Sequence, residues 1–206
     1  MRLLVVGCEY AGKTTLVNNI QEWGKDKGFL FHMDDHFTIP DSQHLSEDEQ
    51  ERMWNLGPVV KERFQRFQVH YHIQILHNYE NVLIVGCHIE EAVFGPRYYH
   101  GKGIMQDYGR KFESDIPLDT TMVHLTARPE VIIDRIKAAP RKYQLMQEDE
   151  IEEVCSLFDQ EVGRSWLRKK VKIDTSDLSE KEVLDACLKA LKPHMTARDL
   201  LLMSQT

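Results

Sequence analysis

Cysteine, proline, glycine and basic residues are all scarce in this chain of 206 residues, and each scarcity argues against a class of protein. The four cysteines stand far apart with no Cys-x-x-Cys pair, which favours free thiols over a disulfide scaffold or a zinc site. Eleven glycines and seven prolines are too few for a collagen-like or linker-like chain. Acidic residues outnumber basic ones by 33 to 26, and the resulting net charge of −7 disfavours a nucleic-acid polymer as partner.

Long apolar runs are also lacking. No stretch of about 18 apolar residues exists, so we expect no membrane helix. The first apolar run, residues 3–6, is too short for the core of a signal peptide, and we expect a cytoplasmic protein. The composition, with 42% hydrophobic and 29% charged residues, is that of an ordinary globular protein of one domain.

Short apolar runs alternate with helix-length segments along the chain, which predicts an α/β fold. The fold class expected is a three-layer sandwich, a five-stranded parallel sheet with helices on both faces. In such a sheet, ligands bind beyond the carboxyl ends of the strands. The predicted domain covers residues 1–193, and residues 194–206 form a tail or a short helix. Strands are expected at 3–6, 29–33, 81–86, 121–125 and 171–173, and helices at 13–25, 59–78, 131–136, 149–166 and 179–191.

The strongest motif lies between the first predicted strand and the first predicted helix. Residues 7–14, Gly-Cys-Glu-Tyr-Ala-Gly-Lys-Thr, match the pattern G-x-x-x-x-G-K-[ST] in full. Gly7 and Gly12 permit backbone angles that turn consecutive N–H groups, with Tyr10 and Ala11 between them, around a phosphate. The positive N-terminal end of the helix adds to this attraction.

The side chains that follow the loop complete a nucleotide site. Lys13 is expected to reach the β- and γ-phosphates, Thr14 to ligate Mg²⁺, and Thr15 to lie close to the α-phosphate. The sequence therefore predicts binding of ATP and Mg²⁺.

Two aspartates at the end of the second predicted strand suggest what happens to the γ-phosphate. The tetrapeptides N-K-x-D and T-K-x-D, which mark guanine-specific GTPases, are missing. Phosphoryl transfer needs a carboxylate that orients the acceptor hydroxyl or takes its proton, and Asp34 or Asp35 fits that role. A helix cap or an outer contact of Mg²⁺ is the alternative role for one of the pair.

With these motifs the chain resembles the P-loop nucleoside and nucleotide kinases, especially the thymidylate-kinase-like group, over most of its length. Residues 33–40, Met-Asp-Asp-His-Phe-Thr-Ile-Pro, look like the Asp-Asp-x-Phe-x-x-Pro stretch of uridine-kinase-like enzymes, where an aspartate faces the acceptor hydroxyl. Residues 88–99, 125–136 and 173–176 are similar to three further segments of the family. The resemblance implies a P-loop kinase fold, a short lid at about 136–148, a small-molecule acceptor and, as a common property of the family, a homodimer.

The resemblance also assigns roles to residues of the lid and to a residue near the adenine base of the nucleotide. In kinases of this shape, lid arginines close over the γ-phosphate and neutralise charge in the transition state, which indicates Arg135 and Arg141. Pairing of Arg135 with an acid on its own helix is the structural alternative. Asp174 lies in the turn after the last strand, which in the family is near the adenine.

Three residues after the third predicted strand are candidates for holding the acceptor. Glu90 and Glu91 can bind an acceptor hydroxyl or share Mg²⁺, or can simply be solvated carboxylates that open a helix. Arg97 stands among aromatic residues and can clamp a substrate, or can form a surface cation–π pair.

One segment departs from the family. An Asp-Arg pair usually follows the third strand, and the arginine holds the phosphate of the acceptor. Here residues 85–88 read Val-Gly-Cys-His. This favours a nucleoside or another alcohol as acceptor over a nucleoside monophosphate. The sequence thus predicts an ATP-dependent kinase of a nucleoside or nucleotide, with a kinase of another small alcohol, or a nucleotide-binding regulatory protein without transferase activity, as the alternatives.

Overall fold

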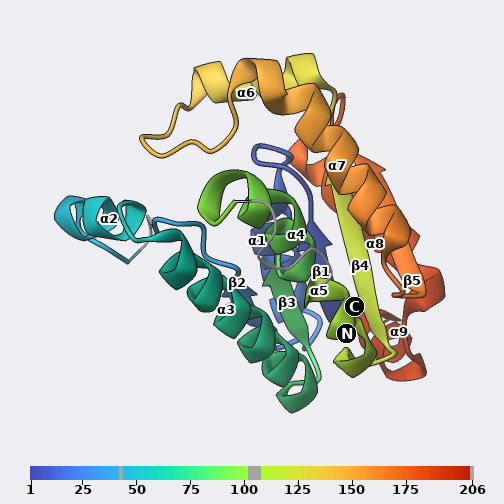
Figure 1. The fold of residues 1–206 in the computed structure, drawn as a ribbon. Coiled ribbons are helices and arrows are strands. Elements are labelled where there is room, and N and C mark those ends of the chain that lie inside the picture. Colours follow the sequence, from blue (N-terminus) through green and yellow to red (C-terminus); the bar gives the residue numbers. More distant parts are fainter. Residues whose placement is uncertain (42–43, 102–107, 205–206) are drawn as a thin grey trace.

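Five parallel strands form one sheet in the order β2-β3-β1-β4-β5. The computed structural model describes residues 1–41, 44–101 and 108–204 (Figure 1). The strands are β1 (Arg2–Val6), β2 (His32–Asp35), β3 (Val82–Val85), β4 (Thr120–Thr126) and β5 (Lys169–Asp174). The first strand lies in the centre, paired in register with β3 on one side and β4 on the other, and Leu3 to Val6 are completely buried. A continuous apolar run is what a strand covered on both faces requires.

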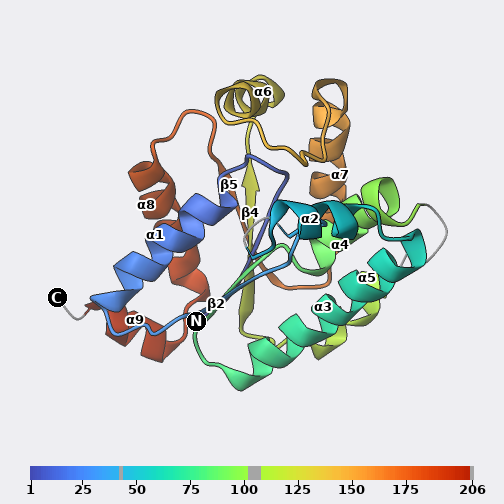
Figure 2. The same cartoon turned by 90° about the vertical axis from the view of Figure 1, so that its left-hand side faces the viewer.

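Helices cover both faces of the sheet, as expected. Figure 2 shows α1 (Lys13–Lys25), α8 (Glu180–Leu191) and α9 (Ala197–Ser204) on one side, and α3 (Pro58–Asn78), α4 (His88–Phe94), α5 (Tyr108–Lys111) and α7 (Ile151–Arg164) on the other. The remaining helical elements are α2 (Glu47–Trp54), η1 (Gly95–Tyr99), η2 (Glu113–Asp115), α6 (Pro129–Ala138), η3 (Glu148–Glu150) and η4 (Lys192–His194). The described residues include no helix that is both long and apolar enough to cross a bilayer.

Local signals fix the ends of several helices. Ser179 caps α8, since its hydroxyl accepts a hydrogen bond from the Glu182 amide while the Glu182 carboxylate accepts one from the Ser179 amide. Gly12, with φ of 98°, lies in the loop that matches the phosphate-binding pattern and is the N-cap residue of α1. The segment at 194–206, expected as a tail or a short helix, contains the helix α9.

The second strand begins later than the sequence indicates. It was expected at 29–33 but runs from His32 to Asp35. Phe29 stacks on Trp23 of α1 instead, with ring centroids 5.4 Å apart, and its amide donates to the carbonyl of Gly24. Ladder pairing starts only at His32, whose amide donates to the carbonyl of Asn81. Asp35 is consequently the last residue of the strand, at the carboxyl edge of the sheet.

Candidate active site

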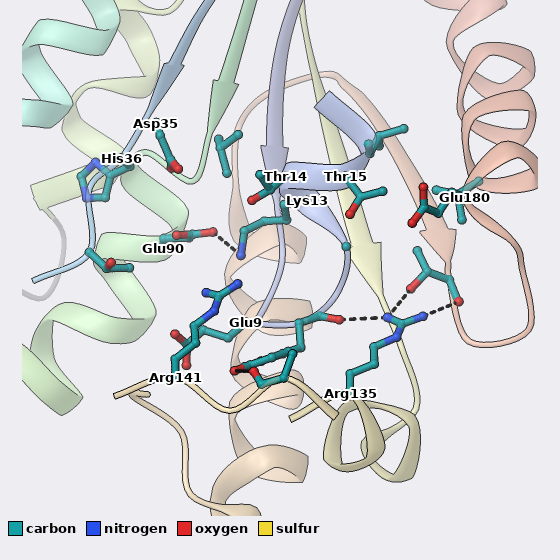
Figure 3. Close-up of a pocket in the computed structure, with 18 of the residues that line it drawn as sticks. Glu9, Lys13, Thr14, Thr15, Asp35, His36, Glu90, Arg135, Arg141 and Glu180 are labelled. Carbon is teal, nitrogen blue, oxygen red and sulfur yellow. Dashed lines mark hydrogen bonds and ion pairs between the residues drawn. The ribbon is translucent and has the colours of Figure 1, made fainter. Parts of the chain in front are cut away.

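A cavity of about 670 Å³ opens at the carboxyl edge of the sheet, where β1, β2 and β3 end (Figure 3). The loop at 7–14 forms its floor, and the end of α6 with the following segment at 139–147 contributes to its other wall. Its lining includes most of the predicted site residues, namely Tyr10, Gly12, Lys13, Thr14, Thr15, Asp35, Glu90, Arg135 and Arg141. The fold therefore gathers side chains from distant parts of the sequence at the place where parallel sheets bind ligands.

The loop has the backbone shape of an anion cradle. Gly7 has φ of +152°, and a Cβ there would lie 2.3 Å from the carbonyl oxygen of Leu125, so only glycine fits. Gly12 also has a positive φ, and the amide of Ala11 donates to the carbonyl of Cys8 across the loop. The first turn of α1 contains no acidic residue, so the positive end of this helix has no carboxylate of its own.

Lys13 lies at the centre of the cavity floor with its side chain only 11% exposed. Its Nζ donates to the carbonyl oxygens of Gly7 at 2.6 Å and Cys8 at 3.1 Å, and forms an ion pair with Glu90 Oε1 at 2.8 Å. Burial by itself lowers the pKa of Lys13, but the charge and hydrogen bond of Glu90, together with smaller contributions that include the charge of Asp35, outweigh it and the pKa is raised. Lys13 is therefore a fixed cation whose partner in this structure is a buried carboxylate.

Asp34 and Asp35 diverge, because successive side chains of a strand point to opposite faces. Asp35 lines the cavity, and burial together with the nearby charge of Glu90 raises its pKa to about 6. Asp34 is not part of the lining and lies beside α3, with its Oδ1 3.9 Å from Nε2 of His72. Burial works against the charge of Asp34, but the nearby His72 and the hydrogen bond from the Asp35 amide hold its pKa below the usual value. The structure thus brings one of the two aspartates to Lys13.

The three acceptor-binding candidates that follow β3, namely Glu90, Glu91 and Arg97, do not lie together. Glu90 is buried against Lys13, as described above. Glu91 lies just beyond, where its Oε1 is 2.9 Å from Nε2 of His100. Arg97 does not line the cavity; it pairs with Glu150 at 3.1 Å and Glu153 at 2.7 Å, so the structure places it in an ion-pair network that joins η1 to η3 and α7.

The two predicted arginines line the cavity in different ways. Arg135 is held on three sides, since it donates to the carbonyl of Tyr10 at 2.9 Å and to the hydroxyl and carbonyl of Thr175 at 3.1 and 2.8 Å. Arg141 lies over the ring of Tyr10, with 4.8 Å between the guanidinium carbon and the ring centroid, and reaches into the cavity (Figure 3). Arg135 therefore connects the phosphate loop to the end of β5, whereas no hydrogen bond joins Arg141 to another residue within 1–41, 44–101 and 108–204.

The far end of the cavity is lined by residues that the sequence reasoning did not select. Leu178, Glu180 and Val183 lie at the turn into α8 and its first residues, next to the end of α6. The apolar face of this helix is visible in the sequence, but nothing in the sequence shows that part of it borders a cavity. Asp174, predicted near the base, is not among the lining residues; its carboxylate accepts hydrogen bonds from the amide and hydroxyl of Ser176.

Glu9 is a further residue that the sequence reasoning missed. Its side chain is buried in the cavity wall, and its Oε2 accepts the amides of Leu145 at 3.1 Å and Met146 at 3.3 Å. Burial raises the pKa of this carboxyl. Because Glu9 belongs to the phosphate loop, it ties the 139–147 segment to that loop. The sequence signal that could have identified Glu9 is the presence of a charged residue at one of the variable positions of the motif.

Comparisons with known proteins support the fold. No family model matches the chain, and no curated protein matches it by sequence. Solved structures match nearly all of it. Deoxyadenosine kinase from M. mycoides with bound dATP has a TM-score of 0.64 at 18% identity, covering 93% of this chain and 100% of that one. The YorR protein from Bacillus subtilis, in complex with phosphorylated GDP, has 0.63 at 17% identity, covering 94% and 99%.

A third match has a different acceptor. Shikimate kinase from Bacteroides thetaiotaomicron has a TM-score of 0.57 at 16% identity, covering 94% of this chain and 97% of that one. At such identities the likeness shows the fold alone. This chain has the P-loop kinase fold, and the predicted fold class is confirmed.

Proposed function

We propose that this chain is a kinase that transfers the γ-phosphoryl group of ATP to a hydroxyl of a small acceptor, with a nucleoside as the favoured class. The observation that carries the proposal is the position of Asp35 in the same cavity as Lys13 and the phosphate loop, while its neighbour Asp34 is turned away. A loop alone would support nucleotide binding. A carboxylate with a pKa of about 6 facing that loop adds a group able to take a proton.

The donor side follows from the loop and its helix. The backbone N–H groups of 8–13 and the N-terminus of α1 would hold the phosphates, and Lys13 would leave Glu90 for their negative charge. The oxygen donors present suit Mg²⁺, since the Thr14 hydroxyl and the carboxylates of Asp35 and Glu90 line one cavity. Mg²⁺ held there would neutralise phosphate charge. Leu178 and Val183 offer an apolar contact for the base.

The acceptor side is acidic, which favours an uncharged alcohol. Glu9, Asp35 and Glu90 border it, and among the described lining residues only Arg141 and the already bonded Arg135 supply guanidinium groups. A nucleoside monophosphate would need a cation of its own, whereas a sugar hydroxyl needs a carboxylate that accepts its proton. Asp35 in its ionised form would accept this proton as the oxygen attacks the γ-phosphorus.

The segment at 136–148 would act as the lid. Arg141 would approach the transferring phosphoryl group and neutralise charge there, and Arg135 would hold the loop and the end of β5 in position. Glu9 would couple the two, because its carboxylate binds lid amides from within the loop.

The test is a screen for acceptor-dependent ATP consumption with Mg²⁺ present. We expect turnover with members of a nucleoside panel, and little with the matching monophosphates. Turnover with sugar acids or polyols only would identify a kinase of another alcohol. If ATP binds but no acceptor raises its consumption, and Asp35→Asn changes nothing, the kinase proposal is wrong and the regulatory alternative holds.

A further inference from the structure

Two cysteines that play no part in the proposed reaction lie in contact behind the phosphate loop. Cys8 directly follows Gly7 in the loop, and Cys155 lies in α7. Their Sγ atoms are 3.6 Å apart, within sulfur hydrogen-bond distance, although the residues are separated by 147 positions. Cys8 is buried and Cys155 is partly exposed. Sequence spacing gave no hint of this pair.

The pair is open to a small reagent from a side that does not involve the nucleotide cavity. Both cysteines line a second cavity of about 340 Å³, bordered by the end of β4 and by α7, and the two cavities share no lining residue. Cys8 nevertheless connects them, because its carbonyl accepts a hydrogen bond from Nζ of Lys13 at 3.1 Å. A covalent change at Cys8 Sγ is therefore transmitted directly to the groups that hold phosphate.

The two thiols differ in reactivity. The hydrogen bond between them raises the pKa of Cys8, and burial raises it further, whereas the same hydrogen bond lowers the pKa of Cys155. The partly exposed thiol is thus the more readily ionised one, and the buried thiol is positioned to react second.

We propose that Cys8 and Cys155 form a modification site for peroxide, and that the resulting disulfide weakens nucleotide binding by displacing the phosphate loop. The thiolate of Cys155 attacks one peroxide oxygen, so that an S–O bond forms and the O–O bond breaks; the hydroxide released takes up the proton that the Cys155 thiol has lost and leaves as the first water. The sulfur of Cys8 then attacks the sulfenic sulfur; the S–S bond forms, the S–O bond breaks, and the Cys8 proton departs with the oxygen as the second water. Two thiols lose two electrons and the peroxide gains them.

The displacement follows from the bond length. The two sulfur atoms of a disulfide are about 2.05 Å apart, so the Sγ atoms of Cys8 and Cys155 must approach each other by roughly 1.5 Å. Cys8 has little freedom to move alone, because the neighbouring Gly7 is packed against the carbonyl of Leu125. The loop is expected to shift with it. The effect on ATP affinity rests on the proposed function, whereas the cross-link itself does not.

The experiment treats the full chain with hydrogen peroxide, maps its disulfides by peptide mass, and measures ATP affinity before and after addition of a reductant. We expect a Cys8–Cys155 cross-link and a loss of affinity on the order of tenfold, reversed by reduction. Cys155→Ser should bind ATP normally and lose nothing on oxidation. Cys187→Ser, at a buried thiol of α8, is the matched control and should respond like the parent chain.

Three results would overturn the proposal: no Cys8–Cys155 peptide after peroxide, a complete cross-link with unchanged ATP affinity, or an equal loss of affinity in Cys155→Ser. A reduced protein that does not bind ATP would instead sink the proposed function. The two failures are distinguishable, since mapping of the cross-link needs no nucleotide.

Discussion

At the scale of single residues, the adjacent aspartates of β2 offer a matched pair for testing chemistry. Asp35 has a pKa raised to about 6 and must be ionised to accept a proton. We therefore expect kcat/KM for the acceptor to rise with pH through about 6. Asp35→Asn should lower the rate by roughly 10²–10⁴-fold. Asp34→Asn should keep the profile, because Asp34 lies beside His72 and outside the cavity lining. A pH–rate profile of all three proteins decides this.

Replacing Asp35 and replacing Asp34 are expected to change the free energy of unfolding in opposite directions. The folded-state pKa of Asp35 lies above the ordinary value of 3.8, so its contribution to stability is fully present below about 3.8 and is lost as the pH rises through about 6. Asp35→Asn removes this ionisation, and at neutral pH it should stabilise the fold by about 1–3 kcal/mol.

Asp34→Asn should destabilise, because the lowered pKa of Asp34 means that its charge supports the fold above the ordinary carboxyl range. Urea unfolding at about pH 7.5 and at about pH 4 measures both effects. An Asp35→Asn protein that is less stable than the parent at the higher pH would contradict the interpretation that burial and Glu90 disfavour the ionised form of Asp35.

At the scale of elements, the segment after α6 supplies a second matched pair. Arg141 reaches into the cavity, whereas Lys142 is exposed and contacts Glu47 at 3.4 Å and the ring of Tyr143 at 5.4 Å from its centroid. Arg141→Ala should lower kcat by roughly 10³-fold, since an arginine that neutralises charge on the phosphoryl group acts mainly in the transition state. Lys142→Ala should leave kcat within about twofold. Steady-state kinetics with saturating ATP tests both, and equal effects in the two variants would remove Arg141 from this role.

Which elements the sequence predicts depends on how local their determinants are. The phosphate loop, the buried strand β1 and the start of α8 each depend on a few consecutive residues. The loop lies directly after β1, and β1 and α8 lie within one residue of their predicted bounds. The start of β2 was predicted too early because Phe29 packs against Trp23 of α1. This contact joins separate segments and cannot be read from a few consecutive residues. The position of Arg97 likewise depends on acids of η3 and α7, more than fifty residues further on.

The site divides in the same way. Most residues of the loop were found from the motif. The role of Glu9 instead depends on its hydrogen bonds with the amides of Leu145 and Met146, and the apolar wall at Leu178 and Val183 depends on the packing of α8 beside α1. Periodicity shows that a helix has an apolar face, but not that part of the face remains uncovered. The alternation of side chains along a strand tells Asp34 from Asp35 only when the bounds of β2 are known. The predicted strand starts three residues too early, at residue 29 in place of His32.

At the scale of the whole molecule, nucleotide binding should tie together several elements that line one cavity. The lining comes from the β1–α1 loop, β2, α4, α6 and α8. A ligand that binds only the folded state stabilises it by about 2.7 kcal/mol at a hundredfold excess over its Kd. We therefore expect Mg-ATP, without any acceptor, to raise the midpoint of thermal unfolding.

Lys13→Ala should abolish most of this shift, whereas Lys25→Ala, at the exposed far end of the same helix, should preserve it. The shift and not the absolute midpoint is the quantity to compare, because removing Lys13 leaves Glu90 buried without its cation and lowers the starting stability. An equal shift in Lys13→Ala and the parent chain would mean that the phosphates are held somewhere other than this loop.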